Sequence, residues 1–289
     1  MDNRTEIREF LTTRRNKITP RQAGLPAHGR NRRVPGLRRE EVALLAGVSV
    51  EYYARLERGS LNGASQTVLD ALARALLLDE AERRHLFDLA RTADTTRRGP
   101  RRGRPQQIRP GLLSLLHAMT DAPAFIRNGR LDVLAVNDLG RDLYAPLFAG
   151  PARPANLARF RFLDDGARDL CPDWEGTAHT TVALLRTEAG RDPYNRELTD
   201  LVGELCTRSE EFRTLWAAHD VRLHQTGVKT FRHPAVGDLA LLFEALPLPA
   251  DPGLTLTAYS AEPGTPAHDR LRLLATWAAT TDEPTHRLS

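Results

Sequence analysis

The sequence is poor in cysteine, in lysine and in long apolar runs. Its two cysteines, Cys171 and Cys206, lie far apart and outside any C-x-x-C arrangement, so neither a disulfide framework nor a zinc site is indicated. No stretch approaches the roughly 18 consecutive apolar residues of a membrane span, and the first 18 residues carry charges where a signal peptide has its apolar core. We therefore expect a soluble cytoplasmic protein that does not enter a membrane.

Signatures of common enzyme classes are also missing. The sequence has no G-x-S-x-G elbow, no P-loop and no G-x-G-x-x-G after a predicted strand. His219 and His224, together with Cys206, come nearest to a metal-ligand set, but their spacing matches no standard zinc pattern. We expect a protein without catalytic residues, bound metal or cofactor.

The positive charge is concentrated at one end of the chain. Residues 1–110 contain 23 Lys and Arg against 13 Asp and Glu, a net charge of +10, whereas residues 111–289 have a net charge of −6. Only two of the 41 basic residues are lysine, so a general preference for arginine contributes to the composition but does not explain the segregation. A basic region of this kind indicates a polyanionic partner such as nucleic acid.

The N-terminal pattern predicts five short helices. Apolar residues recur at helical spacing in residues 3–16, 37–46 and 49–58, and two more helices follow within residues 65–91. Asp79 is the expected N-cap of the last one, with Glu82 completing a capping box. Residues 92–110 are rich in Arg, Pro and Gly, which is typical of a linker. The predicted organisation is an all-α domain (residues 1–91), a basic linker (92–110) and a second domain (111–289).

The second domain has a mixed α and β pattern. Two short apolar runs flank Asn128 and Gly129, which is a strong hairpin signal. Mostly helical sequence follows, then three strands near residues 221–231, 238–246 and 254–259, and a last helix at residues 267–279. The predicted fold is mainly α, with an α+β second domain.

Residues 37–58 have the features of a helix-turn-helix, whose second helix reads the DNA major groove. Gly47 can take the positive φ that ends the first helix, and Ser49 can cap the second. Glu51 has two open interpretations, contact with a base or an intrahelical pair with Arg55. Arg38 and Arg39 are the expected phosphate contacts. The predicted DNA-binding residues are Arg38, Arg39, Ser49, Val50, Glu51, Tyr52, Arg55 and Arg58.

The stretch "GLRREEVALLAGVSVEYYARLERG" resembles the helix-turn-helix of Xre-type regulators as found in the MmyB-like (MltR-like) transcriptional regulators. "NGRLDVLAVN", "NLARFRFLDDGARDLCPDWE", "KTFRHPAVGDLALLFEAL" and "YSAEPGTP" resemble successive blocks of the ligand-binding domain of that family. The resemblance implies a five-helix DNA-binding domain followed by a PAS-like domain with a small-molecule pocket, for which a fatty acid is the implied ligand in at least some members.

The expected function is a DNA-binding transcriptional regulator that acts as a homodimer on an inverted repeat and senses a small apolar or amphipathic molecule. A C-terminal domain that serves only for dimerisation or protein interaction is the alternative. Aromatic residues of the second domain, with a cation for a carboxylate ligand, are the candidate pocket lining, and core packing is the alternative for each aromatic. The predicted ligand-binding residues are Tyr144, Phe160, Trp174, Trp216, Arg222, Phe231, His233 and Phe243.

Overall fold

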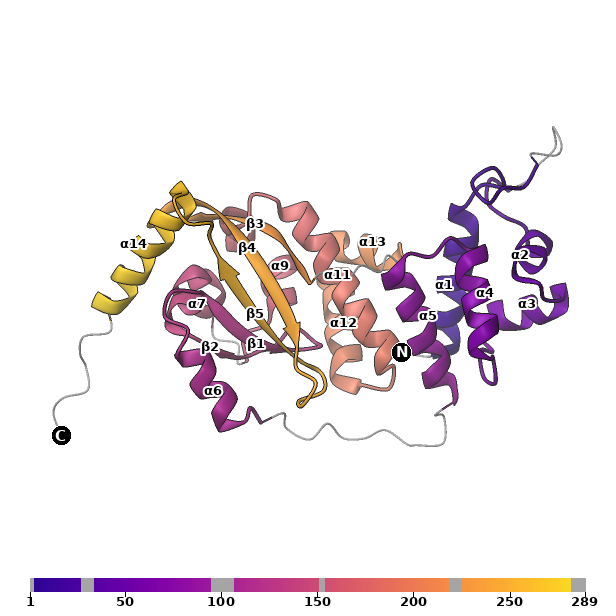
Figure 1. The fold of residues 1–289 in the computed structure, drawn as a ribbon, viewed down its shortest axis with the longest axis horizontal. Helices are drawn as coiled ribbons and strands as arrows, with labels where there is room; N and C mark the ends of the chain where they lie inside the picture. Colours follow the sequence, from indigo (N-terminus) through magenta and orange to yellow (C-terminus); the bar gives the residue numbers. More distant parts are fainter. Residues whose placement is uncertain (1–2, 27–33, 95–106, 151–153, 219–224, 282–289) are drawn as a thin grey trace. The chain divides into compact units, whose positions relative to one another are not determined.

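The computed structural model describes residues 3–26, 34–94, 107–150, 154–218 and 225–281 (Figure 1). Its contacts divide the chain into two compact units. The N-terminal unit consists of Met1–Gly103, Ala183–Glu204 and Arg213–Leu223; the C-terminal unit consists of Arg104–Val182, Leu205–Phe212 and His224–Ser289. The predicted fold class is confirmed, since the first unit is helical and the second is α+β.

The described residues 3–26 and 34–94 of the N-terminal unit include the expected five helices. These are α1 (Asn3–Lys17), α2 (Arg39–Ala46), α3 (Val50–Glu57), α4 (Gln66–Ala75) and α5 (Glu80–Asp94). Their apolar faces share one core, with Phe10, Tyr53 and Leu72 fully buried in it. The predicted capping box begins α5. The Asp79 side chain accepts a hydrogen bond from the backbone N–H of Glu82, and the Glu82 carboxylate accepts one from the backbone N–H of Asp79.

Part of the later sequence also belongs to the N-terminal unit. α11 (Trp174–Arg191), α12 (Arg196–Arg208) and α13 (Glu210–Ala217) each contribute residues to both units. The Arg186 side chain of α11 is completely buried and its Nη1 donates to Glu6 Oε1 of α1 at 2.5 Å. Because such a contact joins positions 180 residues apart, the local pattern that assigned all of residues 111–289 to one domain carries no sign of it.

The C-terminal unit is built on a five-stranded antiparallel sheet with the order β2-β1-β5-β4-β3 (Figure 1). The strands are β1 (Ala124–Asn128), β2 (Val133–Val136), β3 (Thr226–His233), β4 (Gly237–Pro247) and β5 (Leu254–Ser260). The helices of this unit are α6 (Pro110–His117), α7 (Asp138–Leu143), α8 (Ala145–Ala149), α9 (Leu157–Leu163), α10 (Gly166–Leu170) and α14 (Pro266–Thr281). Residues 95–106 of the predicted linker, and residues 221–224 of the predicted strand at 221–231, lie outside the described residues.

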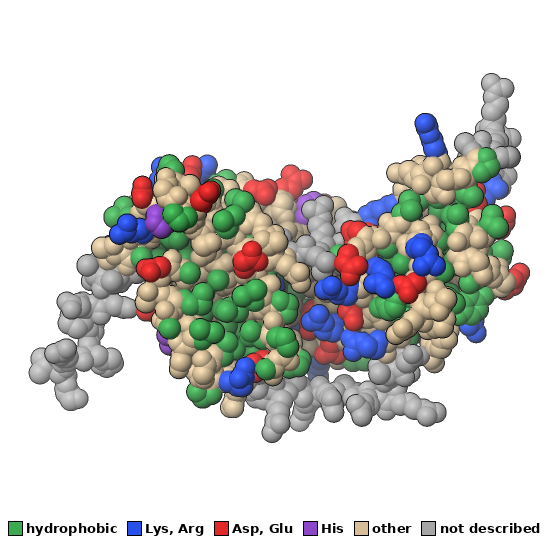
Figure 2. Space-filling model, viewed as in Figure 1, with side chains coloured by type: hydrophobic (Ala, Val, Ile, Leu, Met, Phe, Trp, Pro, Cys, Tyr) green, Lys and Arg blue, Asp and Glu red, His purple; other side chains and the backbone are tan. Residues whose placement is uncertain are grey.

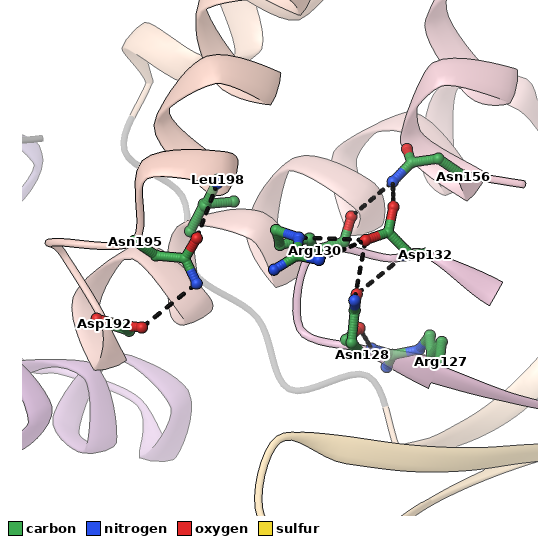
Figure 3. A network of polar contacts seen from close by, with 8 residues as sticks. All are labelled: Arg127, Asn128, Arg130, Asp132, Asn156, Asp192, Asn195 and Leu198. Atoms are coloured by element: carbon green, nitrogen blue, oxygen red, sulfur yellow. Dashed lines mark hydrogen bonds and ion pairs between the residues drawn. The ribbon is translucent and has the colours of Figure 1, made fainter. Parts of the chain in front are cut away.

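The hairpin between β1 and β2 forms where the Asn-Gly signal predicted it, but its turn differs from a two-residue loop. Leu131 N–H donates to Asn128 O at 3.1 Å, and the positive φ of 68° falls on Leu131 and not on Gly129. The buried Asp132 accounts for this turn, because it accepts from the side chains of Asn128 (2.9 Å), Arg130 (3.1 Å) and Asn156 (2.7 Å), as Figure 3 shows. Asn156 also caps α9, so one network holds the hairpin and the start of that helix.

The two faces of the sheet have different environments. One face, with Phe125, Phe231 and Tyr259, packs against α7, α8, α9 and α10 in the main core of the unit. The other face is covered in part by α6, where Leu112 and Leu116 pack against Ile126. Side chains therefore alternate along each strand between the aromatic core and a less covered surface.

Candidate DNA-binding surface and ligand-binding core

The helix-turn-helix formed by α2 and α3 has the turn and the helix cap that the sequence predicted. Gly47 has φ of 65°, the left-handed conformation that ends α2, and it lies in open space. The Ser49 hydroxyl accepts from the backbone N–H of Tyr52 at 3.1 Å and so caps α3. Tyr53 and Leu56 on the inner side of α3 are fully buried, which fixes the rotation of the helix and turns its opposite face outward.

The outward face of α3 carries the predicted base-contacting side chains. Val50, Glu51, Arg55 and Arg58 are exposed, and Tyr52 is half-buried. The Arg55 guanidinium lies 4.7 Å from the centre of the Tyr52 ring. Among the described residues Glu51 forms no ion pair with Arg55. The carboxylate of Glu51 and the guanidinium of Arg55 therefore both remain available to partners outside the protein.

The two arginines predicted to contact phosphate have different surroundings. Arg39 Nε donates to the carboxylate of Glu57, a residue only 1% exposed that also binds Arg15 Nε at 2.6 Å. Arg39 thus ties α2 to α3 within the protein. Arg38 is exposed, and its guanidinium has no partner among the described residues, so of the two it is the one free for a phosphate.

A polar cluster lies within the aromatic core of the C-terminal unit. Lys229 of β3 donates from Nζ to Tyr144 Oη at 2.8 Å, and Tyr144 Oη lies 2.6 Å from Tyr259 Oη of β5. Arg161 of α9 donates from Nη2 to Cys171 Sγ at 3.3 Å and from Nη1 to Ala167 O at 3.2 Å. We call Tyr144, Arg161, Cys171, Lys229 and Tyr259 the core polar cluster.

Burial sets the protonation of this cluster. Removal from water lowers the pKa of Lys229 to about 8, an effect that nearby Arg161 adds to and nearby Cys171 opposes. Burial also raises the pKa values of Tyr144 and Tyr259 well above the ordinary phenol range. At neutral pH the cluster therefore holds two cations, Lys229 and Arg161, and two neutral phenols.

The predicted ligand-binding residues fall into three groups. Tyr144, Phe160, Phe231 and Phe243 are buried in the main core, and only Tyr144 belongs to the core polar cluster. Trp174 is half-buried at the start of α11, and its Nε1 donates to Arg161 O at 3.0 Å.

The remaining three predicted ligand-binding residues lie apart from the core polar cluster or outside the described residues. His233 is buried, with Nε2 3.0 Å from Asp142 O and Nδ1 accepting from Ala235 N–H at 3.2 Å, so both ring nitrogens have backbone partners. Trp216 belongs to the N-terminal unit, where its ring lies 4.1 Å from the Arg186 guanidinium. Arg222 lies outside the described residues, as do His219 and His224.

Sequence reasoning missed Arg161, Cys171 and Lys229. One signal was present, for Lys229 is one of two lysines in a chain with 39 arginines, and it stands on a predicted strand. Arg161 stands inside the apolar run "LARFRFL" of α9, where a charged side chain is unusual. Neither signal indicates which residues of other helices and strands contact Lys229 and Arg161 in the core.

Two family models match the chain. A helix-turn-helix domain model matches residues 9–86, and the model described as the MmyB-like transcription regulator ligand binding domain matches residues 108–274, more than half of the chain. The chain belongs to the MmyB-like transcription regulators. No curated protein matches it.

As an MmyB-like regulator, the protein combines a DNA-binding helix-turn-helix with a ligand-binding domain, and neither matched family is an enzyme family. The exposed face of α3 lies inside the first match, and the core polar cluster lies inside the second. Of the helices that the structure describes, none has the length and apolar character needed to cross a membrane.

Proposed function

We propose that this MmyB-like regulator binds an inverted-repeat operator as a homodimer, and that a small apolar or amphipathic molecule, with a fatty acid as the first candidate, changes its operator affinity. The observation that carries the DNA-binding part is the outward face of α3, where Glu51, Arg55 and Arg58 stand exposed on a helix fixed by its buried inner side. Arginine and glutamate there have the hydrogen-bonding groups that read guanine and cytosine edges. A regulator of this kind acts in the cytoplasm, where the genome lies.

DNA binding is tested by exchanging one arginine at a time. Arg55→Ala should cost about 1–3 kcal/mol on the operator and relax base preference, since a base contact is lost. Arg38→Ala should weaken binding to all sequences alike and reduce the salt slope by about one. Arg84→Ala on α5, which removes the same charge away from α2 and α3, is the matched control. If all three variants lost affinity equally on every sequence, the assignment of roles would be wrong.

Homodimer formation is supported by the sheet face that turns away from the main core. Val228 and Leu242 pair across β3 and β4 and are 64% and 47% exposed, and Leu246 of β4 extends the same row. Figure 2 shows hydrophobic side chains gathered over the strands of this unit. The same row favours the second candidate, a C-terminal domain that serves only for dimerisation. A footprint without dyad symmetry would contradict the inverted-repeat operator.

Coupling between ligand and operator is supported by α11. Its first residue, Trp174, is hydrogen-bonded to Arg161 of the core polar cluster, and its later residue Arg186 pairs with Glu6 of α1 in the N-terminal unit. Linkage makes such coupling reciprocal, and a factor of 5 to 150 in affinity is the usual order. Dodecanoate titrated with and without operator should therefore give two different affinities. Equal affinities would leave the domain as a ligand binder that does not regulate.

A further inference from the structure

The two edges of the five-stranded sheet differ in how far they are covered. At the β2 edge, Val133 N–H donates to Ala155 O at 2.8 Å, on the side away from β1. Leu157 N–H donates to Leu131 O at 2.9 Å beside it. At the other edge β3 runs for eight residues, and its outward backbone groups have no hydrogen-bond partner among the described residues (Figure 1). An open strand edge of this length is a template for pairing with another strand.

The exposed side of β3 lacks the features that usually keep an edge strand from pairing. These features include bulges, prolines and charged side chains. The register of β3 with β4 is regular over all eight residues, and the strand contains no proline. Thr226, Val228 and Thr230, on the side away from the main core, are uncharged. Arg232 follows on the same side, and its Nε lies 3.4 Å from Asp238 of β4. The first five residues of β3 therefore present an uncharged edge.

The side chains at this edge indicate what kind of strand would fit. Val228 is 64% exposed, and its neighbour Leu242 on β4 is 47% exposed. A strand that placed an apolar residue opposite Val228 would extend this apolar row and remove it from water. β3 of another copy offers such a residue in Val228 itself. Antiparallel pairing of two copies about Val228 gives a row of four apolar side chains, with one Leu242 and one Val228 from each copy.

We propose that β3 pairs antiparallel with β3 of a second copy of this chain, with the two Val228 residues directly opposite each other. This inference rests on the proposed homodimer and names its interface. An antiparallel pair of identical strands is two-fold symmetric, which is the symmetry that an inverted-repeat operator requires of a dimer. Pairing in this way joins the two five-stranded sheets into one and satisfies the outward backbone groups of both edges.

Lys229 offers a competing explanation, because an inward-pointing charge on an edge strand is one way in which proteins prevent pairing. The Lys229 side chain points to the core, where it donates to Tyr144 at 2.8 Å. With Val228 opposite Val228, Lys229 stands opposite Gly227, which has no side chain. Centring the pair on Lys229 would set two ammonium groups opposite each other, and like charges in that position are destabilising. The register centred on Val228 avoids this clash and keeps the apolar row.

The register is tested by oxidative cross-linking of the full-length protein, read on a non-reducing gel. Val228→Cys should form a disulfide-linked dimer, because Cα atoms of directly opposite residues lie about 4.5–5.5 Å apart, within the range of disulfides. Thr230→Cys is the matched control on the same face of the same strand. It would stand opposite Thr226, with its own copies about 13 Å apart along the strands, and should not cross-link. Wild type, with the free thiols of Cys171 and Cys206, sets the background.

The interface is tested independently by sedimentation velocity. Val228→Lys should raise the dimer dissociation constant at least about tenfold, because it sets two ammonium groups opposite each other at the dyad. Val228→Thr keeps a branched, uncharged side chain and should remain dimeric. Since Val228 is 64% exposed, both variants should keep the unfolding midpoint of wild type, which shows that they are folded.

The outcomes separate this inference from the proposed homodimer. If Val228→Lys stayed as dimeric as wild type, or if Thr230→Cys cross-linked as strongly as Val228→Cys, the inference would be overturned and the homodimer would need another interface. Absence of cross-linking in a dimeric Val228→Cys would do the same and would favour Lys229 as a guard of the edge. A wild type that is monomeric at the concentration at which it binds the operator would overturn the inference together with the homodimer.

Discussion

Each of the two compact units buries an arginine side chain, but the partners of the buried guanidinium differ between them. In the N-terminal unit Arg186 is 0% exposed, donates to Glu6 and to the backbone oxygen of Trp216, and lies against the Trp216 ring. In the C-terminal unit Arg161 and Lys229 have backbone, thiol and phenol partners, and no carboxylate of the described residues pairs with either. Among the residues that the structure describes, the first arrangement therefore contains an ion pair and the second contains two cations without one.

This difference predicts different responses to substitution in the two units. Removing one partner of a complete buried ion pair leaves an unpaired charge and is strongly destabilising. Removing a partly buried cation that has no carboxylate partner among the described residues relieves a desolvation cost and leaves no buried carboxylate unpaired. Substitutions of the same chemical kind should therefore have opposite effects on stability in the two units.

The largest expected effect is that of Arg186→Met. Because the buried Glu6 carboxylate loses its ion pair with Arg186, the free energy of unfolding of the N-terminal unit should fall by about 3–5 kcal/mol. Tryptophan fluorescence during urea unfolding measures this directly, since Trp216 lies against the Arg186 guanidinium.

Lys229→Met is the matched comparison in the C-terminal unit. Its unfolding midpoint should equal or exceed that of wild type, because a half-buried ammonium is replaced by an apolar side chain of similar length that suits the core. If Lys229→Met lost as much stability as Arg186→Met, the contrast between the two sites would be wrong.

A smaller effect concerns the glycines of α11 and α12. A Cβ at Gly190 would overlap the ring of the buried His85, so Gly190→Ala should destabilise the N-terminal unit by about 1–3 kcal/mol. Gly203 has open space around it, and Gly203→Ala should stabilise α12 by about 0.5–1 kcal/mol. Opposite signs, measured by urea unfolding of both variants, would confirm that the end of α11 is packed into the N-terminal unit. Matching signs would refute this.

The smallest expected effect is a pH dependence of stability that comes from Lys229 in the C-terminal unit. The pKa of Lys229 is about 8 in the folded protein and 10.5 for an ordinary lysine, so the unfolded chain binds more protons between these values. The contribution of Lys229 to stability therefore rises with pH above about 8, by at most about 1.4 kcal/mol per pH unit.

Unfolding should be measured at pH 7.5 and 9.5, below the pH at which tyrosines of the unfolded chain ionise. The change in stability between these values should be more positive for wild type than for Lys229→Met, in which all other titrating groups are retained. An identical change in both proteins would mean that the pKa of Lys229 is not lowered.

Local patterns in the sequence were sufficient for the fold class and for the helix-turn-helix. Gly47 and Ser49 end one helix and begin the next through their own backbone and hydroxyl, and helical spacing places Tyr53 inward and Arg55 outward. Such features depend on residues within one or two turns of each other, which is why the sequence shows them.

Features that depend on distant pairs were not predictable in this way. Arg39 was expected only as a phosphate contact, yet it pairs with Glu57, 18 residues away. Strand alternation places Lys229 on the same face as Phe231, but nothing local indicates that Tyr144, 85 residues away, stands opposite it. Lys229 and Arg161 of the core polar cluster were missed for this reason.

The most direct measurement follows the Lys229 ammonium itself. Because the chain contains only two lysines, Lys17 and Lys229, a protein labelled with nitrogen-15 in its lysine side chains gives two signals, and Lys229→Arg assigns them. The Lys229 signal should titrate near pH 8, because removal of the ammonium from water disfavours its charged form. Titration of Lys229 near 10.5, the pKa of an ordinary lysine, would contradict the account, because it would mean that the core does not remove this ammonium from water.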